Sequence, residues 1–152
     1  MVVCMALRLL ITGSRTWSDV ECIRTAFMQI KDNHGVEVVL VSGACPKGAD
    51  RLCEVVAAEL GWKVELHPAD WNRYGKRAGF VRNSVMIDTE PDLVLGFIHN
   101  GSKGATMTAK LSIKKGIHTI VHKIQDYPFR TYSTKEYNSP NVLPVEPDDT
   151  LF

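Results

Sequence analysis

Three apolar, strand-like runs in this chain each end in a loop that contains glycine. The runs span residues 7–11, 36–41 and 93–98, and the loops that follow them span residues 12–16, 42–50 and 101–106. Small residues let backbone N–H groups come close to an anion, and a helix N-terminus adds the positive end of its dipole. If the three loops meet at one edge of a sheet, they form a site for a phosphorylated small molecule.

The segments between these runs carry apolar residues at helical spacing, such as Val20, Ile23, Phe27 and Ile30. The runs themselves are too apolar to be half exposed, which is typical of a parallel sheet covered by helices on both faces. We therefore predict a Rossmann-like, doubly wound α/β fold with a mainly parallel sheet of about five strands. Open sheets of this type bind ligands outside the carboxyl ends of the strands.

The predicted domain ends where this alternation stops. We expect one domain over residues 1–122, in which the last strand covers residues 119–122 and the third helix spans about 76–88. The polar stretch 68–75 before that helix is expected to be a loop. Four prolines interrupt the chain after residue 122, so residues 123–152 are expected to form a mostly irregular C-terminal tail.

Charge separates some function classes from others. The chain carries 18 Lys and Arg against 17 Asp and Glu, a formal net charge of +1. This balance argues against a protein that mainly neutralises nucleic-acid phosphates. A local basic stretch beside aromatic residues keeps single-stranded nucleic-acid binding open as an alternative. That stretch comprises Arg73, Lys76, Arg77 and Arg82.

The cysteines and the apolar runs bear on metals and membranes. Four cysteines form no CxxC pair, so we expect no metal site, and free thiols fit the reducing cytoplasm. No apolar stretch reaches the roughly 20 residues of a membrane span, so we expect no membrane partner.

The first loop carries Gly13, Ser14, Arg15 and Thr16. It matches neither the dinucleotide GxGxxG fingerprint nor the GxxxxGK[ST] P-loop, so we expect no cofactor such as NAD. A GSR turn still has the groups to hold one phosphate, through backbone N–H groups, the Ser14 hydroxyl and the Arg15 guanidinium. The alternative is a tight turn with a solvated arginine.

The remaining candidates also have two interpretations each. Asp50 either accepts hydrogen bonds from sugar hydroxyls or caps the following helix, and Arg82 either reaches a phosphate or lies in solvent. Trp17, Trp71 and Tyr74 at the predicted rim either stack on a base or pack within the protein. The candidate ligand-binding residues are Gly13, Ser14, Arg15, Thr16, Gly43, Ala44, Gly48, Asp50, Arg82, Asn83, Gly101, Ser102, Gly104, Ala105 and Thr106.

Taken in order, these motifs resemble the SLOG superfamily, and in particular its small YspA-like branch, common in bacteria and their phages. The motifs are GSRTW, SGACPKGAD, PADWNRYGKRAG, RNSVM, PDLVLGF and GSKGA, within residues 7–121. The resemblance implies a Rossmann-like fold that binds nucleotides or their derivatives. Relatives include the "lonely guy" phosphoribohydrolases and the DNA-processing protein A family, and several relatives are dimers, which implies a homo-oligomer.

One departure from these relatives bears on catalysis. The phosphoribohydrolases carry a PGGxGTxxE loop whose glutamate works with a helix arginine, whereas residues 100–108 here read NGSKGATMT. Arg82 has its counterpart, but the glutamate is missing. The leading hypothesis is therefore a module that senses or sequesters a nucleotide or nucleotide-derived ligand. The alternative is a phosphoribohydrolase-like enzyme that cleaves the N-glycosidic bond of a nucleoside monophosphate, with Arg82 on the ligand and Asp50 or Asp70 as acid or base.

Overall fold

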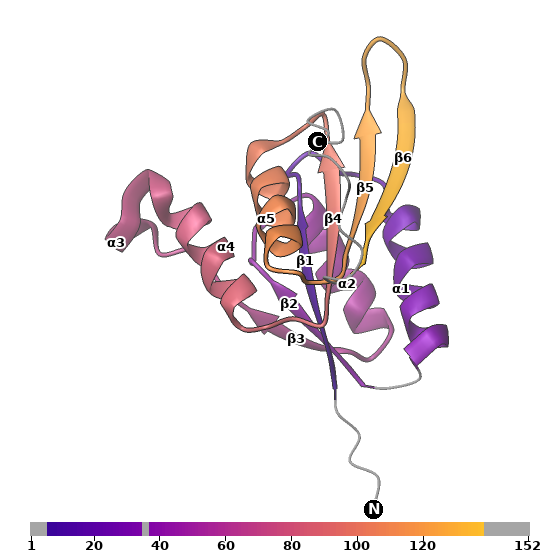
Figure 1. Cartoon of the computed structure of the whole chain (residues 1–152), viewed down its shortest axis with the longest axis horizontal. Helices are drawn as coiled ribbons and strands as arrows, with labels where there is room; N and C mark the ends of the chain where they lie inside the picture. Colours follow the sequence, from indigo (N-terminus) through magenta and orange to yellow (C-terminus); the bar gives the residue numbers. More distant parts are fainter. Residues whose placement is uncertain (1–5, 35–36, 139–152) are drawn as a thin grey trace, which may run out of the picture.

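The computed structural model describes residues 6–34 and 37–138, and its centre is one six-stranded sheet (Figure 1). The strand order across the sheet is β3-β2-β1-β4-β5-β6. The strands are β1 (Leu7–Gly13), β2 (Val38–Ser42), β3 (Lys63–Leu66), β4 (Leu93–His99), β5 (Thr119–Gln125) and β6 (Thr131–Tyr137). Strands β1 to β5 are parallel, and β6 pairs antiparallel with β5. The predicted Rossmann-like, mainly parallel α/β fold is confirmed.

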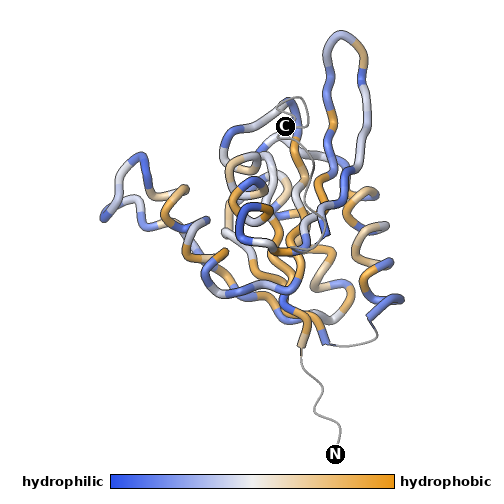
Figure 2. Tube along the Cα trace, in the orientation of Figure 1, coloured by the Kyte–Doolittle hydropathy of each residue, from blue (hydrophilic) through white to orange (hydrophobic). Residues whose placement is uncertain are grey.

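Helices cover both faces of this sheet. Helices α1 (Val20–His34) and α2 (Ala49–Glu59) pack on one face, while α4 (Ala78–Asp88) and α5 (Lys103–Lys114) pack on the other (Figure 1). Alternate side chains of β1 serve the two layers: Leu9 joins the first core cluster and Leu10 the second. Figure 2 shows the hydrophobic residues concentrated along the central strands.

The strand order reverses beside β1. Strands β2 and β3 follow on one side of β1, while β4 and β5 lie on the other, and Gly13 of β1 pairs with Phe97 of β4. The carboxyl ends of β1 and β4 therefore lie side by side at the topological switch point, where open α/β sheets bind ligands.

The C-terminal part differs from the prediction. Strand β5 runs three residues past the expected boundary at 122, and β6 occupies part of the segment expected to be irregular. The prolines led to that expectation, but Pro128 lies in the turn that joins the two strands, while β6 itself is rich in β-branched and aromatic residues. This turn projects beyond the sheet in Figure 1. Residues 139–152 lie outside the described residues.

Local capping explains two helix boundaries. The Asp19 carboxylate accepts a hydrogen bond from the Cys22 N–H at 3.0 Å, one residue before α1 begins. The Asp70 carboxylate accepts one from the Arg73 N–H at 3.1 Å and starts a short helix, α3 (Trp71–Tyr74), inside the predicted loop. A single 3₁₀ turn, η1 (Gly75–Arg77), then leads into α4, two residues later than predicted.

Candidate functional site

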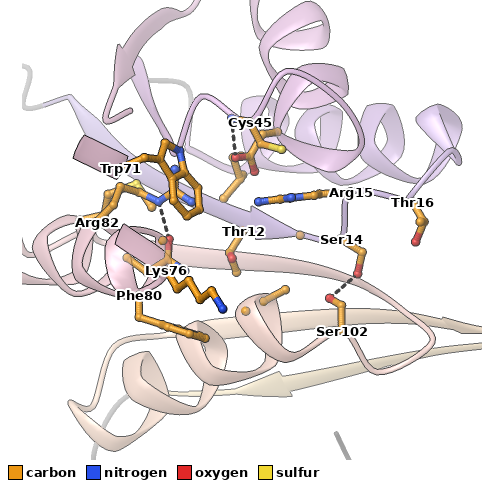
Figure 3. A pocket seen from close by; sticks show the side chains of 18 residues that line it. Thr12, Ser14, Arg15, Thr16, Cys45, Trp71, Lys76, Phe80, Arg82 and Ser102 are labelled. Carbon is orange, nitrogen blue, oxygen red and sulfur yellow. Dashed lines mark hydrogen bonds between the residues drawn. The ribbon is translucent and has the colours of Figure 1, made fainter. Parts of the chain in front are cut away.

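A cavity of about 410 Å³ lies outside the carboxyl ends of β1 and β4 (Figure 3). Its wall is built from the β1–α1 loop, the β2–α2 loop, α3, η1, α4 and the start of α5. The predicted residues that line it are Gly13, Ser14, Arg15, Thr16, Asp50, Arg82, Asn83, Ser102, Gly104 and Ala105. Segments distant in sequence thus meet where the three-loop pattern predicts.

The other predicted residues lie elsewhere. Gly43 and Ala44 line a neighbouring cavity of about 480 Å³, which shares Arg15, Cys45, Trp71 and Arg82 with the first. Three predicted residues line neither cavity: Gly48, Gly101 and Thr106.

Ser14 ties the three loops together. Its side chain is 2% exposed, and its Oγ accepts the His99 N–H at 2.8 Å and lies 2.6 Å from Ser102 Oγ. Its carbonyl oxygen accepts the Ala49 N–H at 3.1 Å. The Ser14 hydroxyl is therefore engaged within the protein, and Ser102, its partner, is the more exposed of the two.

The second loop packs directly on the first. A Cβ at Gly48 would lie 2.4 Å from the Ser14 carbonyl oxygen, and Gly48 has a φ of +77°. Only glycine fits such a position without strain. A Cβ at Gly13 would likewise lie 2.2 Å from the Cβ of Ala49. These two glycines allow close packing between backbone segments, so their role is structural.

Asp50 is a buried carboxyl in the cavity wall. Its Oδ2 accepts the Cys45 N–H at 3.2 Å and so holds the β2–α2 loop. Burial raises the pKa of Asp50 to about 6, although the Cys45 hydrogen bond and the nearby Arg82 and Arg15 guanidinium groups lower it. Asp50 therefore takes up a proton under mildly acidic conditions.

Arg82 faces the cavity, but much of its guanidinium is already engaged. Its Nη1 donates to the carbonyl oxygens of Gly43 and His67, and its Nε donates to Asn83 Oδ1 at 2.7 Å. Burial lowers the pKa of Arg82, and Asp50 acts in the opposite direction. The side chain thus joins α4 to the loop after β2 besides forming part of the wall.

Two other cations extend into the cavity with fewer restraints. Figure 3 shows Arg15 and Lys76 reaching into the space between Trp71 and Ser102. Both residues are exposed. On the far wall α5 begins: no side chain caps its N-terminus, and a Cβ at Gly104 would meet nothing within 4 Å. Free helix N–H groups opposite two cations make this part of the cavity suitable for an anion.

Two aromatic side chains lie on either side of Lys76 in the cavity wall (Figure 3). Trp71 is 51% exposed and Phe80 is 43% exposed, and both line the cavity. Trp17, in contrast, is 3% exposed and packs edge-on against Phe97 with ring centroids 5.4 Å apart. Its expected place at the rim was wrong: Trp17 is a core residue.

Asp70 and Tyr74 lie away from the main cavity. Both line a separate cavity of about 260 Å³, and Asp70 caps α3. Sequence reasoning did not assign Phe80 to the site. The feature that points to Phe80 is an exposed aromatic side chain on α4 that does not belong to the buried face formed by Ala78, Met86 and Ile87.

The described residues contain neither a metal-binding cluster nor a membrane-spanning helix. Among residues 6–34 and 37–138, no three His, Cys, Asp or Glu side chains group in a way that could hold a metal ion. No helix within the same ranges has the length and apolar character needed to cross a membrane.

The doubly wound sheet, with a cavity at its switch point, places this chain in the class of Rossmann-like proteins. Within that class, the chain belongs to the YspA, cpYpsA-related SLOG family, whose sequence profile matches residues 7–74. The Gene 61 protein of Mycobacterium phage D29 is 35% identical over 118 residues, which cover 74% of this chain and 94% of that protein. Family membership supports a nucleotide-related binding function in general.

Proposed function

We propose that the cavity at the switch point binds a nucleotide or a nucleotide-derived phosphorylated small molecule, which the protein senses or sequesters. The observation that carries this proposal is the division of the cavity into two walls. One wall has the uncapped start of α5 and Arg15, and the other has Trp71 and Phe80 with Lys76 between them (Figure 3). A phosphate fits the first wall and a base fits the second.

The size and chemistry of the cavity support the same conclusion. Its volume of about 410 Å³ lies within the range of small-molecule sites. Arg15 has a planar guanidinium that suits bidentate phosphate contacts, and Gly104 leaves room for the ligand beside the helix backbone. Arg82, with two of its nitrogens bonded to the protein, positions the loop after β2 rather than serving as the main phosphate ligand.

A thermal-shift screen tests this proposal. Nucleoside mono-, di- and triphosphates, cyclic nucleotides and ADP-ribose derivatives are added to the purified full chain. A ligand at 100 times its dissociation constant adds about 2.7 kcal/mol to the free energy of unfolding. We expect a shift with a phosphorylated compound and none with its parent nucleoside. If no phosphorylated nucleoside raises the melting temperature, the proposal is wrong.

Two matched variants locate the phosphate wall. Arg15→Ala removes an exposed cation from the cavity, so we expect weaker binding at an unchanged melting temperature of the free protein. Arg51→Ala is the control, because Arg51 is also exposed but lies on α2 outside the cavity. Equal loss of affinity in both variants would indicate a general charge effect instead of a site.

One observation favours a second candidate function, the phosphoribohydrolase-like cleavage. Asp50 lines the cavity, and burial raises its pKa to about 6, which suits a general acid near neutral pH. The test is release of free base from AMP by the purified protein, with Asp50→Asn as the variant. Activity that survives Asp50→Asn would remove Asp50 from that role.

A further inference from the structure

The His99 imidazole, at the end of β4, lies between a hydroxyl and a carboxylate. Its Nδ1 is 2.7 Å from Thr16 Oγ1, and its Nε2 is 2.6 Å from Asp126 Oδ2. The His99 side chain is 17% exposed. The three groups come from the first loop, the end of β4 and the residue after β5, so the tertiary fold creates this arrangement.

The Asp126 carboxylate determines which atoms of the Thr16, His99 and Asp126 side chains carry protons. The hydrogen bond from His99 lowers the pKa of Asp126, so the carboxylate is ionised and accepts the proton on Nε2. In the neutral imidazole, Nδ1 is then the unprotonated nitrogen. The Thr16 hydroxyl must donate to it. A hydroxyl whose proton points at a base held by a carboxylate is the arrangement of an activated nucleophile.

No other imidazole among the described residues has both partners. His122 contacts the Thr134 hydroxyl at 3.0 Å without a carboxylate, while His118 and His67 each contact only a glutamate, at 2.6 and 2.7 Å. His99 therefore differs from the histidines that serve strand edges and surface ion pairs. Its hydroxyl partner, Thr16, lines the cavity wall.

We propose that Thr16 is a nucleophile activated by His99 and oriented through Asp126, and that it attacks a phosphoester bound in the cavity. Thr16 is exposed, whereas the neighbouring Ser14 is buried with its oxygen already bonded.

The reaction balances as a hydrolysis. Thr16 Oγ1 gives its proton to His99 Nδ1 and forms a bond to phosphorus, while the bond from phosphorus to the ester oxygen breaks. The leaving oxygen takes the proton from His99 Nδ1. Water then attacks the phosphorylated threonine with His99 again as base, which releases phosphate and restores the hydroxyl. Asp126 keeps its charge throughout and acts as a positioning residue.

An alkyl fluorophosphonate probes the nucleophile directly, because an activated hydroxyl displaces fluoride from phosphorus and becomes covalently labelled. The test measures labelling of the full chain by intact mass and maps the modified residue by peptide analysis. We expect one adduct, on Thr16. Thr16→Val abolishes it, Thr16→Ser retains it, and His99→Ala slows it by at least about 100-fold. Because this probe contains no nucleotide, its outcome is independent of the nucleotide-binding proposal.

Two further comparisons separate a relay from simple support of the fold. Asp126→Asn slows labelling by at least about tenfold, because an amide no longer fixes the imidazole tautomer, and Asp126→Glu restores most of the rate. Thr134, beside a histidine without a carboxylate, stays unlabelled. Circular dichroism and melting temperature confirm that each variant is folded. Absence of labelling in the wild-type chain, an adduct on Ser14 or Ser102, or a rate insensitive to His99→Ala would each overturn the proposal.

Discussion

Helices α2 and α5 both begin at the same edge of the sheet after a glycine-bearing loop, yet their N-termini differ. At α2, the Ala49 N–H donates to the Ser14 carbonyl oxygen, and a Cβ added at Gly48 would lie only 2.4 Å from that same oxygen. At α5, no side chain caps the helix, and a Cβ added at Gly104 would meet no atom within 4 Å. Protein atoms therefore cover the N-terminus of α2, whereas the N-terminus of α5 is open to the cavity.

The difference shows what a glycine after a strand means. At α2, glycine lets two loops of the protein touch, so it serves stability. At α5, glycine leaves room beside the helix N–H groups, so it serves a ligand. Substitutions at the two helix starts should therefore have opposite effects on stability and binding.

The largest effect is expected from Gly48→Ala. The new Cβ would clash with the backbone of Ser14 and Arg15, and an alanine at a φ of +77° is strained. We expect the free energy of unfolding to fall by about 3–5 kcal/mol, measured by denaturant titration. Gly101→Ala is the control, because its φ is +63° but its Cβ meets nothing within 4 Å. A loss at Gly48 no greater than that at Gly101 would show that packing is not the cause.

The first turn of α2 also predicts a pH dependence. Native Asp50 keeps its proton up to about pH 6, whereas the ordinary pKa of a free aspartate side chain is 3.8. The native state therefore binds more protons between these values, and its free energy of unfolding falls as pH rises from about 4 to about 6. Asp50→Asn removes this fall, so the variant gains roughly 3 kcal/mol relative to wild type between pH 4 and pH 7. Parallel stability curves for the two proteins would contradict the buried-carboxyl account.

Gly104→Val tests the open helix. The side chain would project into the cavity at the start of α5, so we expect at least a 100-fold loss of affinity, about 2.7 kcal/mol, for the nucleotide found in the thermal-shift screen. Valine has a somewhat higher helix propensity than glycine, so we expect the free energy of unfolding of the variant to differ from that of the wild type by no more than about 1 kcal/mol. Isothermal titration and denaturant titration measure the two quantities. Unchanged affinity would place the ligand elsewhere.

The sequence predicts this edge of the sheet well, because apolar runs and glycine loops are local patterns. It does not predict which groups are already bonded within the protein. Arg82 lies 39 residues from Gly43 and 15 from His67, and only the fold shows that its guanidinium holds their carbonyl oxygens. The Ser14 hydroxyl is likewise engaged by His99, 85 residues away.

The C-terminal strand and the His99 arrangement escaped prediction for a similar reason. Strand β6 is mostly exposed, so its pattern lacks the apolar run that marked the other strands, and pairing with β5 creates it. Asp126 follows β5 in a segment expected to be irregular, and it lies 27 residues from His99. Long-range partners of polar groups depend on topology, which local patterns do not encode.

The smallest effect is expected at the link between the first and third loops. Ser102→Ala removes one partner of Ser14 Oγ, which still accepts the His99 N–H at 2.8 Å, so we expect a loss of about 1 kcal/mol in the free energy of unfolding. Ser14→Ala leaves that N–H without its acceptor and should cost more, about 1–3 kcal/mol. Denaturant titration of the two variants compares them directly. If Ser102→Ala costs more than Ser14→Ala, then the start of α5 supports the fold as the start of α2 does, and the contrast between the two helices fails.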